Sequence, residues 1–285
     1  MRLAVTPLPG GITNLNYRVD ADGQAFVLRI GLEGAELLGI DRRREHRCMV
    51  AASRAGVAPE VVYARPGEGL LVTRFTPGRS LVPGRAVRGT LRARVVRAMR
   101  RCHGGPPFVG RFSPSRTLET YLAAARGGPS PLPPDADRLV ERVSSIAAIL
   151  RRSRAAPQPC HNDLWGRNLI DDGRRVHIVD WEYAGMGDRF FDLANFAIYH
   201  CPTDGADAAL LSAYFGRARP STLARLKLMK IVAELREALW YVVSLRLPTG
   251  RRRGAASAAA HFRRCRQALA DPRLPCWFEA VTRRE

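Results

Sequence analysis

The feature that most constrains this 285-residue chain is a set of polar residues with fixed order and spacing near its middle. The segment His161-Asn-Asp-Leu-Trp-Gly-Arg-Asn168 is followed by a short apolar run that ends in Asp180. The runs Asn168–Ile170 and Val176–Val179 read as two short strands, so the polar residues lie in a strand–loop–strand context. Because residue type, order and context must all agree, the pattern is a specific one.

These residue types fit phosphoryl transfer. That reaction needs a carboxylate that accepts or orients the proton of a hydroxyl, and oxygen ligands that hold Mg²⁺ against the phosphates. We predict the first role for Asp163 and the second for Asn168 and Asp180, provided that the intervening loop is tight. The alternative is a polar loop whose Asp and Asn only cap turns. His161 is expected to brace the loop backbone by hydrogen bonding.

Hydrophobic periodicity divides the chain into a strand-rich beginning and a mostly helical remainder. A hairpin is expected at 16–30, around the turn Asp20-Ala-Asp-Gly23, and another at 60–75. Between them, Asp41 is expected to cap a helix that runs to about residue 55. Further helices are expected at about 85–103, 117–126, 136–154, 188–201, 205–216, 221–246 and 254–270.

This order predicts an α+β, two-lobed, protein-kinase-like fold. Residues 1–76 would form a small β-rich lobe that binds the nucleotide. Residues 77–285 would form a larger helical lobe that carries the catalytic and acceptor-binding residues. ATP would lie between the two.

Composition is that of a globular protein, with 46% hydrophobic and 25% charged residues. No apolar run approaches the roughly 20 residues that a membrane span requires. The apolar stretch at the N-terminus is too short for a secretory signal. We therefore expect a cytoplasmic protein. The six cysteines show no C-x-x-C spacing, which argues against a disulfide framework and a zinc site.

The formal net charge of +20 raises the question of nucleic-acid binding. Lys227 and Lys230 are the only lysines among 46 basic residues, and the arginines are dispersed without interleaved aromatic residues. We expect a solvated basic surface that attracts anions, ATP included, and no specific nucleic-acid partner.

Over nearly its whole length the chain resembles the choline/ethanolamine kinase branch of the aminoglycoside phosphotransferase-like kinases. The resemblance rests on HNDLWGRN, on VDWEYAG and on FFDLANF. It implies bound ATP and Mg²⁺, with Asp163 as catalytic base and Asn168 and Asp180 as magnesium ligands. It also implies that Asp192, in the third segment, supports the catalytic loop.

The resemblance extends to the N-terminal segment. Gly10 and Gly11 would let the backbone approach the phosphates, and Thr13 would bind their oxygens. Arg29 stands where a protein kinase carries its phosphate-binding lysine, and a guanidinium group suits phosphate oxygens. Glu45 matches the family's acidic partner of that basic residue. The alternatives are that Gly10 and Gly11 form an ordinary turn, that Arg29 faces outward on its strand and that Glu45 lies on a solvated helix face.

The segment 71–78 resembles the strand-to-hinge segment against which adenine stacks. Adenine recognition there uses backbone groups, so Arg74 and Thr76 are candidates by position.

The acceptor site is expected on a helix near the C-terminus. Glu237, Trp240 and Tyr241 share one face of it, and an acid beside two rings can hold an ammonium group. The resemblance implies the same, because choline kinases place a tryptophan-containing helix here. Tyr199 and Glu182 are further candidates. The alternative is that Trp240 and Tyr241 are core residues and that the glutamates are surface charges. No second tryptophan follows Trp240 at close spacing, in contrast to eukaryotic choline kinases.

We therefore expect an ATP- and Mg-dependent kinase, monomeric or homodimeric, that phosphorylates a hydroxyl of a choline/ethanolamine-like amino alcohol. An aminoglycoside or thiamine-type acceptor is the first alternative, although the Arg-rich C-terminal region offers few acids for a polycation. A catalytically silent pseudokinase is the second. Retention of Asp163, Asn168 and Asp180 argues against it.

Overall fold

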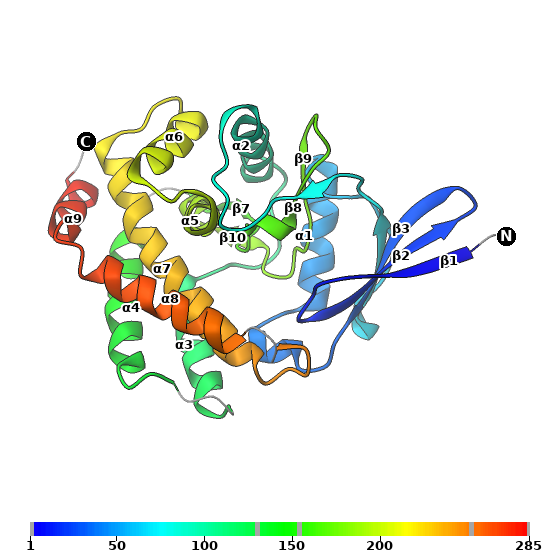
Figure 1. Cartoon of the computed structure of the whole chain (residues 1–285), viewed down its shortest axis with the longest axis horizontal. Coiled ribbons are helices and arrows are strands. Elements are labelled where there is room, and N and C mark those ends of the chain that lie inside the picture. The colour runs from blue at the N-terminus through cyan, green and yellow to red at the C-terminus, as the bar shows by residue number, and fades with distance from the viewer. Residues whose placement is uncertain (1–2, 129–131, 153–155, 251–253, 284–285) are drawn as a thin grey trace.

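The structure is a computed structural model that describes residues 3–128, 132–152, 156–250 and 254–283. A small antiparallel sheet lies at one side and a larger helical part at the other (Figure 1). This arrangement confirms the predicted α+β organisation.

The sheet has five antiparallel strands in the order β1-β2-β3-β5-β4. Its strands are β1 (Leu3–Leu8), β2 (Asn14–Ala21), β3 (Gln24–Gly31), β4 (Val61–Arg65) and β5 (Leu70–Arg74). The turn between β2 and β3 contains Asp22 and Gly23, both with positive φ, as a tight two-residue hairpin turn requires. Both predicted hairpins are therefore confirmed, whereas β1 was not expected.

Helix α1 (Arg42–Arg54) connects β3 to β4 and runs beside the sheet (Figure 1). Its N-cap is Asp41, whose carboxylate accepts hydrogen bonds from the backbone N–H groups of Arg43 and Arg44. The buried side of the helix carries Glu45 among Cys48, Met49 and Ala52. The predicted helix is confirmed, and it presents one charged side chain toward the protein interior.

The helical part is built around α7 (Pro220–Ser244), which packs against the helices α3, α4, α5, α8 and α9. Its helices besides α7 are α2 (Gly89–His103), α3 (Pro114–Arg126), α4 (Ala136–Arg151), α5 (Arg189–His200), α6 (Asp204–Phe215), α8 (Gly254–Leu269) and α9 (Leu274–Thr282). None of the helices in the described residues is both long and apolar enough to cross a membrane.

The predicted helices differ from these in four places. Helix α3 begins at Pro114, three residues before the predicted start, with Ser113 as its N-cap. Helix α2 begins at Gly89, because the backbone N–H groups of Gly84 and Val87 donate to the end of α5. Helix α4 ends at Arg151, and part of the predicted extension to residue 154 lies outside the described residues. Helix α9 was not expected.

Short strands surround the polar motif. The predicted pair is present as β8 (Leu169–Asp171) and β9 (Val176–Ile178), and β6 (Arg79–Ser80) adds to it. Two further strands, β7 (Gln158–Cys160) and β10 (Gly185–Gly187), pair with each other and were not expected. Short 3₁₀ turns are η1 (Ala35–Leu38), η2 (Pro66–Glu68) and η3 (Gly166–Asn168).

The chain passes from the sheet to the helical part through Gly78, which has φ +144°. A Cβ atom there would lie 2.6 Å from the backbone oxygen of Asp171 and 2.8 Å from Cγ2 of Ile170. Gly78→Ala should therefore lower the free energy of unfolding by about 3 kcal/mol, through backbone strain and steric clash together.

Gly39→Ala is the control, because Gly39 has φ +74° and open space around a Cβ. It should cost only about 1 kcal/mol, from the left-handed backbone alone. Urea unfolding of both variants measures the difference. Equal losses would show that Gly78 is needed for its φ angle and not for its close approach to β8.

Candidate active site

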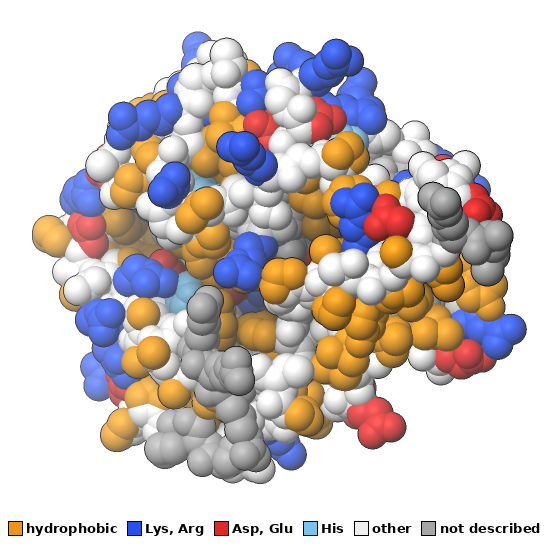
Figure 2. Space-filling model, turned by 45° about the vertical axis from the view of Figure 1, so that its right-hand side comes forward, with side chains coloured by type: hydrophobic (Ala, Val, Ile, Leu, Met, Phe, Trp, Pro, Cys, Tyr) orange, Lys and Arg blue, Asp and Glu red, His pale blue; other side chains and the backbone are white. Residues whose placement is uncertain are grey.

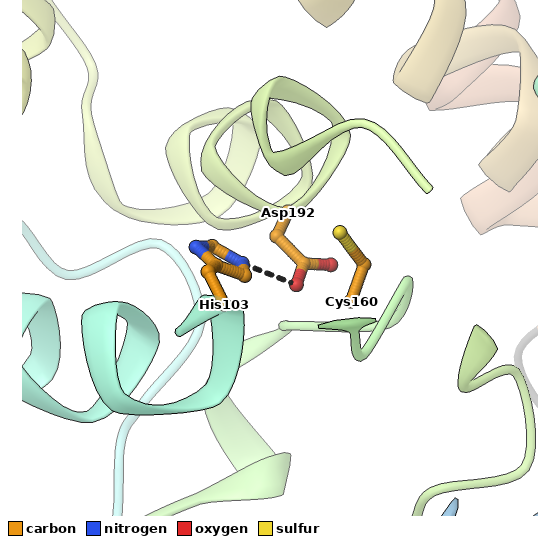
Figure 3. A group of neighbouring side chains, drawn as sticks. All are labelled: His103, Cys160 and Asp192. Atoms are coloured by element: carbon orange, nitrogen blue, oxygen red, sulfur yellow. Dashed lines mark hydrogen bonds and ion pairs between the residues drawn. The ribbon is translucent and has the colours of Figure 1, made fainter. Parts of the chain in front are cut away.

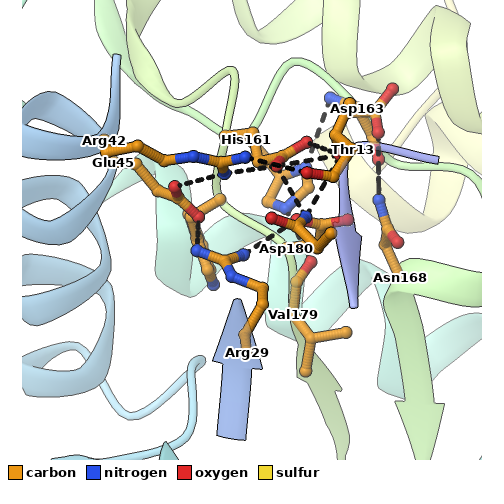
Figure 4. Close-up of polar contacts among 12 residues, drawn as sticks. Thr13, Arg29, Arg42, Glu45, His161, Asp163, Asn168, Val179 and Asp180 are labelled. Carbon is orange, nitrogen blue, oxygen red and sulfur yellow. Dashed lines mark hydrogen bonds and ion pairs between the residues drawn. The ribbon is translucent and has the colours of Figure 1, made fainter. Parts of the chain in front are cut away.

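The loop of residues 161–168, predicted to be catalytic and here named the catalytic loop, folds back on itself between β7 and β8. The Asn168 side chain donates to the backbone oxygen of Asp163 (2.9 Å) and to its Oδ2 atom (3.1 Å) (Figure 4). Two residues five positions apart are thus in direct contact, as the predicted tight loop requires. Because the amide nitrogen of Asn168 is used in this way, its oxygen is the atom available to a cation.

The other carboxylate oxygen of Asp163 accepts a hydrogen bond from Nη1 of Arg236, at 2.9 Å. Arg236 is fully buried, and its guanidinium group lies 4.5 Å from the centre of the Tyr183 ring. Burial raises the pKa of Asp163 to about 7, and Arg236 opposes that shift. Sequence reasoning missed Arg236, although a charged residue next to Glu237 in a helix with many apolar residues was a signal.

Arg29 projects from β3 to the same place. It pairs with Glu45 of α1 through Nη2, and its Nη1 atom lies 3.1 Å from Oδ1 of Asp180 (Figure 4). The strand position is therefore inward-facing, and the outward-facing alternative is wrong for Arg29.

Oxygens of Glu45, Asp180 and Glu182 lie within 4.8 Å of one another. Burial, with the neighbouring Glu182, raises the pKa of Asp180, and a divalent cation would relieve this crowding of carboxylates. Carboxylate and amide oxygens are the ligands that Mg²⁺ prefers, so this donor set, with Asn168 nearby, fits a magnesium ion. Asp180 itself has φ +65°, a strained angle of the kind found at functional sites.

Glu182 was predicted to contact the acceptor, but the structure places it against the N-terminal loop. Its carboxylate accepts from Oγ1 of Thr13, at 3.0 and 2.9 Å, and from the side chain of Asn14. Arg42 of α1 also donates to Glu182, to Glu45 and to the backbone oxygen of Thr13. Arg42 was not predicted, because in the sequence it is one of three consecutive arginines.

The glycine loop between β1 and β2 lies against the catalytic loop. Gly10 and Gly11 have φ +102° and +98°. A Cβ on Gly11 would lie 2.5 Å from the backbone oxygen of Asn14, so a larger residue does not fit there. A Cβ on Gly10 would lie 3.5 Å from Nη1 of Arg167, a residue of the catalytic loop.

The two residues assigned to adenine by position have different surroundings. Arg74 pairs across the sheet with Phe26, which places its side chain on the face opposite to Arg29. There it contacts Gln24, Glu60 and the Phe26 ring. The side chain of Arg74 therefore points away from the site, and only its backbone remains a candidate. Thr76 is half-buried just beyond β5.

The remaining acceptor candidates lie together on α5 and α7. Glu237 accepts from Asn195 (3.1 Å), from the Tyr199 hydroxyl (2.8 Å) and from Arg236. Trp240 donates to the Tyr183 hydroxyl at 2.7 Å, and its ring meets Tyr241 edge-on with centres 5.1 Å apart. The Trp165 ring, from the catalytic loop, lies 6.2 Å from Tyr199. Sequence reasoning did not include Trp165.

Asp192, on α5, holds the catalytic loop from behind. Its fully buried carboxylate accepts from the backbone N–H groups of His161 (2.8 Å) and Asn162 (2.6 Å). It also accepts from His103 (3.0 Å), as Figure 3 shows. Three donors satisfy this carboxylate, so its closeness to His103 and Cys160 needs no metal to explain it. Burial raises the pKa of the Cys160 thiol, which suits a packing residue and not a nucleophile.

His161 braces the loop as expected. Its Nε2 atom is 3.0 Å from the backbone oxygen of Val179, and its Nδ1 atom accepts from the backbone N–H of Asp163. Both ring nitrogens of the neutral imidazole are thus hydrogen-bonded. Burial lowers the pKa of His161 to about 4, from 6.5.

This shift predicts a pH dependence of stability. Between pH 6.5 and pH 4 the unfolded chain binds the proton and the folded protein does not, so the free energy of unfolding falls as the pH is lowered through that window. The slope from this one group approaches about 1.4 kcal/mol per pH unit. His161→Gln should remove it, whereas the same change at His46 on α1 should leave it. Urea unfolding at several pH values measures the slope, and an unchanged slope in His161→Gln would contradict the assignment.

Residues 4–228 match the model of the phosphotransferase enzyme family. Protein LicA of Haemophilus influenzae is 28% identical over 190 residues, which cover 65% of this chain and only 55% of the relative. The chain thus aligns with about half of that relative's length.

Solved structures of similar fold cover nearly the whole chain. A choline/ethanolamine kinase family protein from Mesorhizobium loti has a TM-score of 0.79 and 29% identity, covering 99% of this chain and 92% of that one. Choline kinase LicA from Streptococcus pneumoniae has a TM-score of 0.76 and 20% identity, covering 95% and 94%. The predicted kinase-like fold and the resemblance to this group are confirmed.

Proposed function

Because the chain belongs to the phosphotransferase enzyme family, we propose that it transfers the γ-phosphate of ATP, with Mg²⁺, to a hydroxyl of a small choline- or ethanolamine-like amino alcohol. The observation that carries the proposal is the contact set of Asp163. One of its oxygens meets Asn168 and the other meets Arg236. The carboxylate is thereby fixed in one orientation beside the cluster of Arg29 and Asp180.

Asp163 is the proposed base. A carboxylate oxygen has two lone-pair directions, so each oxygen of Asp163 can still accept the acceptor's hydroxyl proton while its existing hydrogen bond persists. With the carboxylate held by two neighbours, catalysis comes mainly from positioning the hydroxyl for in-line attack and from stabilising charge.

The proposed nucleotide site is the cluster of Arg29 and Asp180 with the residues around it. Asn168, Asp180 and Glu182 would hold Mg²⁺, which when bound neutralises charge on the phosphates. Arg29, oriented by Glu45, would bind phosphate oxygens, and the loop at Gly10 and Gly11 would bring backbone N–H groups close to them. Asp163 with these residues makes up one phosphotransfer centre.

The acceptor's ammonium group would bind on the side of Asp163 where α5 and α7 lie. Of the two acids predicted to bind it, Glu182 lies in the carboxylate cluster of the proposed metal site, and Glu237 is already paired with Arg236. Four rings remain half-buried on this side of Asp163, and they belong to Trp165, Tyr199, Trp240 and Tyr241. A quaternary ammonium is held by ring faces alone, whereas a primary ammonium needs oxygen acceptors for its N–H groups. This favours a choline-like acceptor over ethanolamine, and over aminoglycosides with their several ammonium groups.

The assay is Mg²⁺-dependent ADP release from ATP with choline, ethanolamine, thiamine and several aminoglycosides. Asp163→Asn should lower turnover about 10²- to 10⁴-fold, because the amide cannot accept the proton, and should leave ATP affinity unchanged. Asp172→Asn, in the turn between β8 and β9, is the matched control and should retain activity. Substantial activity in Asp163→Asn would contradict the mechanism. ATP binding without stimulation by any acceptor would point to another acceptor or to a silent nucleotide-binding protein.

The acceptor preference is tested in the same assay. We expect kcat/KM for choline to exceed that for ethanolamine about tenfold, which is the size of one good cation–π contact. Trp240→Leu should raise KM for choline by a similar factor without changing KM for ATP. Trp277→Leu, on α9, is the control and should change neither. A preference for ethanolamine or an aminoglycoside would show that oxygen acceptors, and not ring faces, bind the cation.

A further inference from the structure

The face of the sheet that lies opposite to Arg29 is unusually apolar for a surface. Cross-strand pairing places Pro7, Tyr17, Leu28, Val72 and Tyr63 in one row that crosses all five strands. None of these side chains is buried. We call this the outer sheet face. An antiparallel sheet in solution normally has its apolar residues on the packed side and polar residues on the other.

Strand β1 extends the outer sheet face to the edge of the sheet. Leu3 and Val5 lie on it and remain 58% and 54% exposed. None of the side chains of β1 is buried, and β1 pairs only with β2. An ordered strand that buries so little of its own surface, with one free edge, is a typical site for association.

The electrostatics indicate what kind of partner fits. Segments 3–31 and 60–75, which form the sheet, contain four arginines and four carboxylates, so their formal charge is zero while the whole chain carries +20. The arginines at the β4–β5 side of the face are paired with acids. Arg65 lies 3.1 Å from Glu68, and Arg74 lies 3.4 Å from Glu60. A surface of zero formal charge neither attracts anions nor repels a second copy of this basic chain.

The size of the outer sheet face also fits. Five strands about 4.8 Å apart, of five to eight residues at about 3.3 Å each, make a face of roughly 24 by 21 Å. With the relief of its side chains, that is on the order of the 800 Å² per partner that a standard protein interface buries. Figure 2 shows hydrophobic side chains gathered over the lower right of the view, the side of the molecule where Figure 1 places the sheet.

We propose that the outer sheet face is the contact surface for a second copy of this chain. Two such sheets would pack face to face across a twofold axis, as in a β-sandwich, so that each Leu28 lies under its partner's sheet. Arg29 and the glycine loop project from the other side, so the dimer leaves the active site open. The inference does not depend on the proposed reaction.

The test is the mass of the purified full chain by sedimentation equilibrium, in 0.15 M and 1 M NaCl. We expect twice the chain mass of 31.5 kDa at micromolar concentration, with no weakening at high salt because the contact is apolar. Val5→Glu should raise the dimer dissociation constant at least about tenfold, since it places two charges in an apolar contact. Val82→Glu, at a valine 52% exposed outside the sheet, is the matched control and should dimerise normally.

Circular dichroism and thermal unfolding of both variants show whether either substitution affects folding. A monomer at every concentration would overturn the proposal. So would a dimer that Val5→Glu leaves intact, or one that Val82→Glu weakens as much. If the chain is monomeric and co-sediments with anionic phosphatidylserine vesicles in a Val5-dependent way, a membrane occupies the face instead and the proposal is also overturned.

Discussion

The candidate active site depends on arginines that alternate with carboxylates, most of them buried or half-buried. Arg29 joins the sheet to Glu45 of α1 and to Asp180 beyond β9. Arg42 joins the same Glu45 to Glu182, and Arg236 joins Asp163 to Glu237. Breaking a buried ion pair is strongly destabilising, so the buried members of this set, such as Glu45 and Arg236, constrain the groups that they pair with. The set fixes the sheet, α1, the loop 161–168, the β8–β9 hairpin and α7 relative to one another at the place where the chemistry is proposed.

This arrangement also divides the carboxylates by role. Asp163 is held by an arginine and an amide and is left with free lone pairs, which suits a base. Asp180 and Glu182 crowd together with raised pKa for Asp180, which suits a cation. Glu237 meets Arg236, Asn195 and Tyr199, so it orders the acceptor side without offering an unpaired charge there. Carboxylates with different neighbours thus suit three different proposed roles.

The two faces of the sheet have opposite characters for the same physical reason. Side chains alternate along each strand, so Arg29, Leu71 and Thr73 face inward while Leu28, Val72 and Arg74 face outward. The inner face carries polar groups such as Arg29, which we propose to bind the nucleotide. The apolar residues that give the strands their β propensity are therefore left on the outer face.

The sequence by itself determined the local features. The spacing from His161 to Asp180 predicted the catalytic hairpin, and Asp41 predicted the start of α1, because loops, caps and turns depend on neighbouring residues. It also identified Asp163, Asn168, Asp180, Arg29 and Glu45, which the structure brings together. Only the tertiary structure decided the partners: Arg236 for Asp163, Arg42 and Thr13 for Glu182, and the outer face for Arg74. These contacts join residues far apart in the chain, or depend on strand register, where a shift of one residue reverses the face. A local sequence pattern contains neither the long-range contacts nor the strand register.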